Sequence, residues 1–168
     1  MSTIENHLGW AWLGPFYLLA VAVPLSVIDI RQRRLPNKLV LPGFIVVWLA
    51  QLVESIRRGD FTSMGLATVC ALGMFALALI ANRIGALGMG DVKLLALIGQ
   101  SFGWWGLGTL SVAVLSGILF AAVFVLAALA VRRLSATSTI PLGPYLLAGC
   151  LLATVQLCFS EGVVSLPA

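Results

Sequence analysis

Residues 8–28 read LGWAWLGPFYLLAVAVPLSVI, a run of 21 residues without Asp, Glu, Lys, Arg or His. About 20 apolar residues in an α-helix cross the hydrocarbon core of a bilayer. The whole chain of 168 residues is 61% hydrophobic and only 10% charged. Because a soluble globular protein needs more charge than this on its surface, the sequence predicts a protein whose solvent is a lipid bilayer.

Three more stretches lack charged residues, and they differ in length. Residues 61–82 form a second run of 22, whereas residues 39–53 form a run of only 15. Glu54 and Arg57 follow this shorter run, and their side chains can extend to the interface, so we expect a helix from about residue 38 to 56. The third stretch is a run of 38 residues at 94–131, which is too long for one crossing.

This long run is interrupted by SFGWWG at residues 101–106, whose glycines and tryptophans suit a turn at the membrane interface. We therefore expect two helices there. A last helix is expected from Pro141 to about Phe159, because Pro141 and Pro144 are tolerated in a first helical turn. The sequence thus predicts an all-α, polytopic integral membrane protein with about six transmembrane helices, forming a single membrane-embedded domain over residues 1–168.

The basic residues indicate an orientation. No Lys or Arg precedes the first apolar run, whereas Arg31, Arg33 and Arg34 follow it. This order is unlike that of a cleaved signal peptide and favours a retained first helix with the N-terminus outside. Eight of the ten Lys and Arg residues then lie on the inner side, and only Arg57 and Arg58 lie outside. We expect a multi-pass protein of the cytoplasmic membrane.

The six acidic residues divide unevenly under the same topology. Four fall in outer segments or at outer helix ends: Glu5, Glu54, Asp60 and Glu161. Asp29, which ends the first helix, and Asp91, which begins the fourth, fall on the inner side at similar depth. A carboxylate at the edge of the hydrocarbon is energetically unfavourable, so it usually has a charged partner or a function. Asp29 and Asp91 are therefore the candidate functional pair.

Two roles are compatible with the position of these aspartates. Each can pair with a nearby base, which would be Arg31 or Arg33 for Asp29 and Lys93 for Asp91. Alternatively, the two carboxylates face each other across a water molecule and share one proton, because repulsion and desolvation disfavour a second charge. One member of such a dyad acts as a base and the other as an acid, and together they can hydrolyse a peptide bond without a metal.

The residues around each aspartate add detail. Asp91 lies in Gly88-Met89-Gly90-Asp91-Val92-Lys93. Here we expect Gly88 and Gly90 to allow a positive φ and the close approach of a substrate strand. Asp29 is followed by IRQRRLPN at residues 30–37, in which Pro36 stops a helix and Asn37 can cap the next one.

These two stretches resemble those of the type IV prepilin peptidases, a family of membrane aspartyl proteases with a GxGD motif. The family's first aspartate precedes a basic loop and an Ile/Leu-Pro-Asn sequence, as Asp29 does, and its second lies in Gly-x-Gly-Asp-x-Lys, as Asp91 does. A weaker match is Pro141-Leu142-Gly143-Pro144, which is similar to a Pro-x-Gly-Pro element before the family's last helix.

The resemblance implies an aspartic endopeptidase that removes the basic leader from type IV prepilins or pseudopilins at the cytoplasmic membrane face. Asp29 and Asp91 would be its catalytic residues, and Gly88, Gly90 and Lys93 would support the catalytic loop. Other residues would line the site: Pro36, Asn37, Pro141, Gly143 and Pro144.

Long members of the family add an inner loop with paired CxxC motifs and a methyltransferase activity. Here only residues 31–38 separate the first two helices, so the chain resembles the short form found with Flp or tight-adherence pili. The resemblance therefore implies no metal, no cofactor and no methyltransferase activity in this chain, and it leaves open whether another protein methylates the product.

Other function classes are disfavoured or remain as alternatives. His7 is the single histidine, which disfavours zinc hydrolysis and a Ser-His-Asp triad, and the bases form no stripe suited to nucleic acid. One alternative is a small ion- or proton-coupled transporter that binds a cation at Asp29 and Asp91. The other is a non-enzymatic component of a pilus or secretion assembly. The particular prepilin and the oligomeric state stay open.

Overall fold

Helices make up nearly all of the described chain. The computed structural model describes residues 9–32, 37–130 and 142–161, the side chains of residues 32, 37 and 38 excepted. Within these ranges the elements, in chain order, are η1 (Trp10–Trp12), α1 (Leu13–Gln32), α2 (Asn37–Arg58), α3 (Thr62–Arg83), α4 (Met89–Gly103), α5 (Leu107–Ala130) and α6 (Gly143–Ser160).

The all-α, polytopic prediction is confirmed. In the part of the chain that the structure describes, five segments are long and apolar enough to cross a membrane, and they correspond to α1, α2, α3, α5 and α6. The long apolar run is divided where the sequence predicts, because α4 ends at Gly103 and α5 begins at Leu107. Gly106, with a φ of +102°, makes the turn between them.

Helix α4 differs from the predicted fourth span. Its 15 residues extend about 22 Å, which is less than the roughly 30 Å of a bilayer's hydrocarbon core. Eleven of these residues are buried. We therefore describe α4 as a core helix that is enclosed by the five longer ones.

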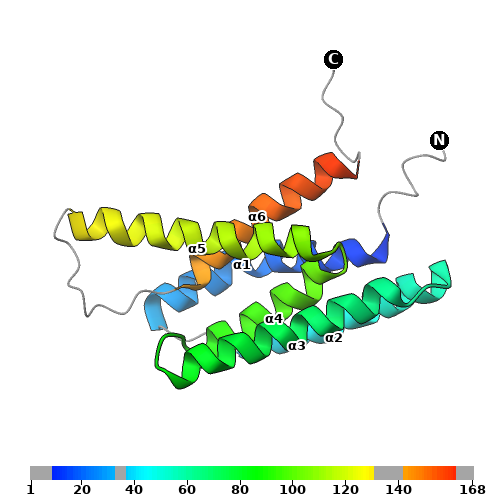
Figure 1. Ribbon diagram of the computed structural model, residues 1–168, viewed down its shortest axis with the longest axis horizontal. Helices are drawn as coiled ribbons and strands as arrows, with labels where there is room; N and C mark the ends of the chain where they lie inside the picture. Colours follow the sequence, from blue (N-terminus) through cyan, green and yellow to red (C-terminus); the bar gives the residue numbers. More distant parts are fainter. Residues whose placement is uncertain (1–8, 33–36, 131–141, 162–168) are drawn as a thin grey trace, which may run out of the picture.

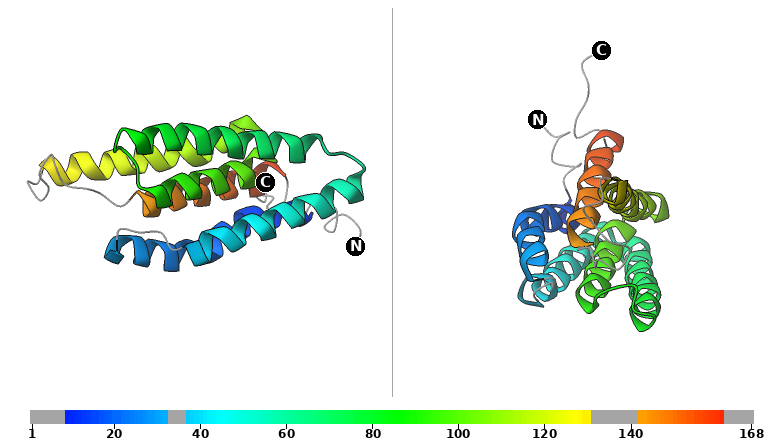
Figure 2. Two further views of the ribbon diagram at one scale, coloured as in Figure 1. Left: turned by 90° about the horizontal axis from the view of Figure 1, so that it is seen from below. Right: turned by 90° about the vertical axis from the view of Figure 1, so that its left-hand side faces the viewer.

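The helices form two flanking groups around a central pair. Seen along the bundle, α1 and α2 lie on one side, α3 and α5 lie on the other, and α4 and α6 lie between them (Figure 2). The end of α1, the start of α4 and the start of α6 lie at the same end of the molecule (Figure 1). We call this the aspartate end, because Asp29, Asp91 and Gly143 lie in these three segments.

Glycines allow the central helices to approach their neighbours closely. A Cβ atom on Gly99 of α4 would lie 2.8 Å from the carbonyl oxygen of Cys70 in α3. A Cβ atom on Gly117 of α5 would lie 2.9 Å from the Cα atom of Leu146 in α6. Small residues are typical of helix contacts in membranes, where lipid removes the hydrophobic drive for association and dispersion contacts replace it.

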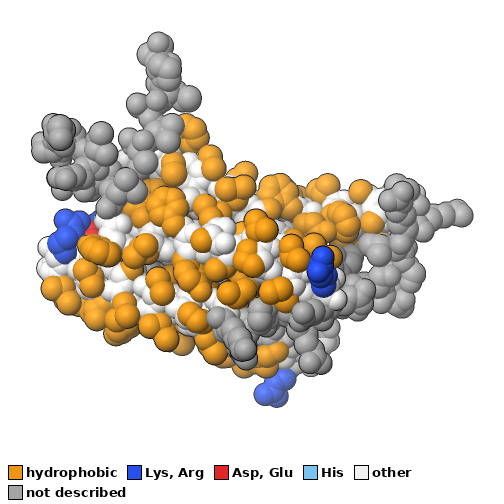
Figure 3. Space-filling model, turned by 180° about the vertical axis from the view of Figure 1, so that it is seen from behind, with side chains coloured by type: hydrophobic (Ala, Val, Ile, Leu, Met, Phe, Trp, Pro, Cys, Tyr) orange, Lys and Arg blue, Asp and Glu red, His pale blue; other side chains and the backbone are white. Residues whose placement is uncertain are grey.

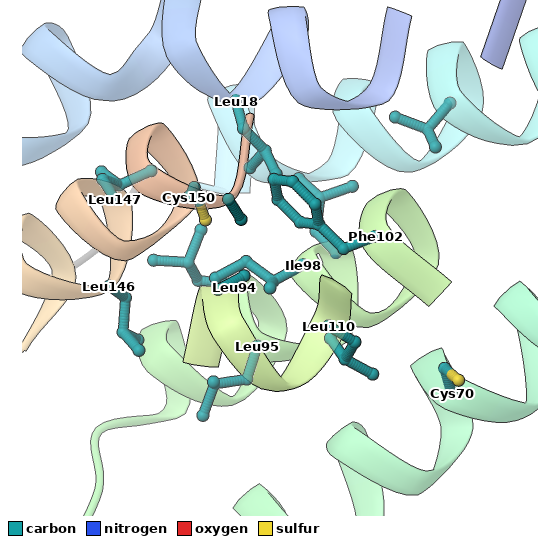
Figure 4. Packing of buried hydrophobic residues seen from close by; sticks show 14 of the residues in the cluster. Leu18, Cys70, Leu94, Leu95, Ile98, Phe102, Leu110, Leu146, Leu147 and Cys150 are labelled. Carbon is teal, nitrogen blue, oxygen red and sulfur yellow. The ribbon is translucent and has the colours of Figure 1, made fainter. Parts of the chain in front are cut away.

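The apolar core lies between these helices. Leu18 of α1, Ile98 and Phe102 of α4, and Cys150 of α6 converge on one cluster (Figure 4). The outer surface is also largely hydrophobic: orange side chains cover the middle of the face in Figure 3, and the visible Lys and Arg side chains lie toward its margins. This distribution suits a bundle surrounded by lipid.

Candidate active site at the aspartate end

Asp29 is a buried carboxylate held by a distant part of the chain. It lies near the end of α1, and only 5% of it is exposed. Its Oδ2 atom accepts a hydrogen bond from the backbone N–H of Gly143, with an N···O distance of 3.1 Å. Because Gly143 is the first residue of α6, this bond joins the end of the first spanning helix to the start of the last.

The start of α6 is suited to this contact. The first N–H groups of an α-helix have no partner within the helix, and the positive end of the helix dipole favours an anion there. Pro144 follows Gly143 in the first turn, where its fixed φ is compatible with a helix. A Cβ atom on Gly143 would lie 2.7 Å from Oδ2 of Asp29, so the position has no room for a side chain.

Asp91 is positioned by its own helix. It is the third residue of α4, whose N-cap is Gly88. A Cβ atom on Gly88 would lie 3.3 Å from Oδ2 of Asp91, so the carboxylate lies beside the backbone of its own N-cap residue. Its Oδ1 atom is buried and has no hydrogen-bond partner among the residues that the structure describes.

The two carboxylates lie within electrostatic reach of each other. Asp91 lies outside the five spanning helices, and its pKa is raised to about 6. Burial is the main cause, and the charge of Asp29 raises this pKa further, whereas the N–H of Gly88 lowers it. The prediction that α1 and α4 bring Asp29 and Asp91 to one end of the bundle therefore agrees with the geometry.

The backbone at Gly88 and Gly90 differs from the sequence prediction. Gly88 has a φ of −73° and Gly90 lies within α4, so neither adopts the expected positive φ. Gly85, three residues before Gly88, has a φ of +77° and makes the turn instead. The reason is that α4 begins at Met89, earlier than expected, which leaves Gly88 extended as its N-cap.

The other predicted site residues belong to the same end of the bundle, and the structure describes some of them. Lys93 is half-buried on the first turns of α4, and Pro144 is half-buried at the start of α6. Asn37 is the first residue of α2, but its side chain is not described. Pro36 and Pro141 lie outside the described residues. Arg31 is exposed, and its predicted ion pair with Asp29 is not present between these two described residues.

Glu54 was expected to reach the interface and instead is fully buried at the opposite end of the bundle. Its carboxylate binds Arg57 and Arg58, each with a shortest N···O distance of 2.5 Å, and accepts the N–H of Trp10 at 3.1 Å. The signal that sequence reasoning missed is the spacing: Arg57 and Arg58 follow Glu54 by three and four residues, so all three lie on one helix face.

The aspartate end has the groups needed for acid–base chemistry. It holds two carboxylates from different helices, of which one has a raised pKa and an unpartnered oxygen atom. Two such groups tend to share one proton, so that one can accept a proton while the other donates one. A water molecule held between them could attack a carbonyl carbon.

Comparisons with known proteins agree with this reading. The model of the type IV leader peptidase family matches residues 16–131. A prepilin leader peptidase/N-methyltransferase of Aeromonas salmonicida (strain A449) is 31% identical over 146 residues, covering 82% of this chain and 47% of that protein. A protein of the same description from Pectobacterium carotovorum subsp. carotovorum is 34% identical over 149 residues, covering 84% of this chain and 50% of that protein.

The chain spans about half the length of the curated relatives it matches. No solved structure matches it. The family match nevertheless extends from α1, before Asp29, through α4 and α5, and so includes both aspartates and well over half of the chain. The chain therefore belongs to the type IV leader peptidase family.

Proposed function

We propose that this protein is a membrane aspartic endopeptidase that removes the basic leader from type IV prepilins or pseudopilins, with Asp29 and Asp91 as its catalytic dyad. The proposal includes an N-terminus on the outer side of the inner membrane and an active site on its cytoplasmic side. Membership of the family supports the reaction class. The distribution of Lys and Arg supports the orientation.

The convergence of the two carboxylates is the observation that carries the proposal. Asp29 and Asp91 are 62 residues apart, yet the charge of one raises the pKa of the other. A carboxylate pair is an efficient catalyst only when both groups reach the same water and the same peptide bond. Asp29 comes from a spanning helix and Asp91 from a core helix, so both have rigid supports.

The reaction is a metal-independent hydrolysis. One carboxylate removes a proton from water, whose oxygen attacks the carbonyl carbon of the scissile bond. The other carboxylic acid donates its proton, first toward the carbonyl oxygen, and a proton then reaches the leaving nitrogen as the C–N bond breaks. The substrate would have a basic leader followed by an apolar helix, so its scissile bond would lie at the membrane edge, near the depth of the two aspartates.

Separate Asp29→Asn and Asp91→Asn variants test this proposal. Each is co-expressed with a small pilin that has a basic leader, and removal of the leader is followed by its gel shift. We expect both variants to lose processing, because an amide can neither accept nor donate the required proton. Asp60→Asn is the matched control, since Asp60 is an exposed aspartate at the opposite end of the bundle. Normal processing by either active-site variant would exclude the dyad.

A further inference from the structure

The two aspartates have different hydrogen-bond environments. Asp29 accepts an N–H group from another helix, because its Oδ2 atom lies at the N-terminus of α6. Asp91 lies beside the backbone of Gly88 at the start of its own helix, and its Oδ1 atom is buried without a partner in the described part of the chain. This difference bears on which carboxylate holds the shared proton.

We infer that the N–H of Gly143 holds Asp29 as the unprotonated base and that the shared proton resides on Oδ1 of Asp91, which makes Asp91 the acid. Gly143 is thus a positioning residue that acts through Asp29. The inference rests on the proposed function and adds an assignment of roles to the two aspartates.

Burial disfavours the charge of Asp29, which is only 5% exposed, but its hydrogen bond favours the charged form. A backbone N–H donor stabilises a carboxylate but offers nothing to the proton of a carboxylic acid. The donor belongs to a helix N-terminus, where the aligned peptide dipoles favour negative charge. Because a Cβ atom on Gly143 would come within 2.7 Å of Oδ2, glycine is required for the carboxylate to lie against this amide.

The contacts of Asp91 favour its protonated form. A buried, charged oxygen atom without a donor carries a full desolvation cost. A proton on Oδ1 removes this cost and converts the atom into a donor, which can bond to water or to a substrate carbonyl. Asp29, the nearby charge that acts on Asp91, also favours a neutral Asp91.

The other charged groups near Asp29 and Asp91 do not change the assignment of base and acid. Helices α5 and α6 carry no charged side chain between Leu107 and Ala130 or between Gly143 and Ser160. The bases near this end of the bundle, within the described ranges, are Arg31 on α1, Arg83 at the end of α3 and Lys93 on α4, together with Lys38, whose side chain is not described. Arg31 and Arg83 are exposed, so solvent screens both. Lys93 is half-buried two residues after Asp91, but the pKa of Asp91 is set by burial, Asp29 and Gly88.

The assignment gives each proton a path. Asp29 takes one proton from the attacking water, and the resulting hydroxyl group bonds to the carbonyl carbon. Asp91 gives the proton on Oδ1 to the carbonyl oxygen. When the C–N bond breaks, the leaving nitrogen takes the proton from Asp29, and Asp91 recovers its proton from the collapsing intermediate. The pair returns to its initial state with one water consumed.

A Gly143→Ala variant tests the positioning role. We expect kcat for prepilin cleavage to fall about 10- to 100-fold with little change in KM, because a hydrogen bond to a charged group is lost or displaced. The acid limb of the pH profile of kcat should move up by about one pH unit, since the base loses the donor that stabilises its anion. A purely structural effect would lower activity without moving this limb.

Two other glycines provide controls. Gly73→Ala adds a methyl group inside α3 where no heavy atom lies within 4 Å, so activity should be unchanged. Gly149→Ala places a methyl group against the backbone of α5, so it should lower thermal stability without moving the acid limb. The inference is overturned if Gly143→Ala keeps the wild-type kcat, or if it loses activity without moving the acid limb.

Infrared spectroscopy of the substrate-free protein locates the proton independently of activity. At pH 5, between the ordinary aspartate value of 3.8 and the value of about 6 for Asp91, the C=O stretch of a protonated carboxyl group should be present. Asp91→Asn should remove this band, and Asp29→Asn should retain it, because burial still disfavours charge on Asp91. The reverse pattern would overturn the inference even in a variant that folds poorly or cleaves nothing. If wild-type protein has the expected spectra but cleaves no prepilin, the proposed function alone fails.

Discussion

Gln51 and Gln100 exchange hydrogen bonds between α2 and α4 in the interior of the bundle. The side-chain amide of Gln51 donates to the backbone carbonyl of Gln100 at 2.8 Å, and the side-chain amide of Gln100 donates to Oε1 of Gln51 at 2.6 Å. Both side chains are buried. Because α4 carries Asp91, this pair fixes the register of the helix that presents one of the two candidate catalytic groups.

Replacing one glutamine should cost more than replacing both. Gln51→Leu leaves the buried side-chain amide of Gln100 without its acceptor, and Gln100→Leu leaves the buried Oε1 atom of Gln51 without its donor, so we expect each to destabilise the protein by about 0.5–2 kcal/mol. The double variant removes both amides and should be no less stable than the weaker single variant. Thermal unfolding in detergent measures this double-mutant cycle, and strictly additive losses would contradict the coupling.

Glu54 supports the opposite end of the bundle. Glu54→Gln should lower the unfolding temperature by several degrees, because Arg57 and Arg58 lose their carboxylate partner and Trp10 loses a charged acceptor. In membranes, prepilin cleavage by the folded fraction should keep its wild-type pH profile, since the aspartate end is unchanged. A loss of activity without a loss of stability would indicate that Glu54 acts on the site.

The proposed orientation can be tested by labelling. Asp60 and Ala86 are both exposed and lie in connections at opposite ends of the bundle, after α2 and after α3. In a variant without the three native cysteines, Asp60→Cys should react with a membrane-impermeant maleimide on intact cells. Ala86→Cys should react only after the cells are opened. The opposite pattern would invert the proposed topology.

The helices were largely predictable from the sequence, because the length of a charge-free run is tied to the thickness of a bilayer. The turn between α4 and α5 was predictable because glycine favours a turn and tryptophan favours the membrane interface. The length of α4 was harder to predict from the sequence. Its apolar residues are buried by neighbouring helices, and hydropathy alone does not separate such a helix from one that contacts lipid.

The candidate site was predictable only in part. Topology was sufficient to bring Asp29 and Asp91 to one end, since one helix arrives where the other departs. The hydrogen bond between Asp29 and Gly143 joins residues 114 positions apart, and no local pattern encodes the direction of a backbone N–H group across that separation. The surroundings of Trp104 were likewise not predictable: it is 5% exposed and clusters with Ala67 of α3, and the guanidinium of Arg58 lies 5.9 Å from its ring centroid.

The raised pKa of Asp91 predicts a pH-dependent cost to folding. A carboxyl group with a pKa of 3.8 when unfolded and about 6 when folded binds its proton more tightly in the folded state. Its stabilising contribution is complete below pH 3.8 and is lost as the pH rises through 6. Asp91→Asn should therefore raise the unfolding temperature at pH 7.5 and change it much less at pH 4.

Asp60→Asn gives a control with the opposite sign. Asp60 accepts hydrogen bonds from the N–H and hydroxyl groups of Thr62, which lower its pKa. Its contribution is present above pH 3.8 and is lost only as the pH falls below that value, so the variant should be slightly less stable than wild type at both pH 7.5 and pH 4. Thermal melts of both variants at the two pH values make the comparison. If Asp91→Asn is destabilising at pH 7.5, then the charge of Asp91 is not unfavourable in the folded protein, which contradicts its raised pKa and its role as the acid.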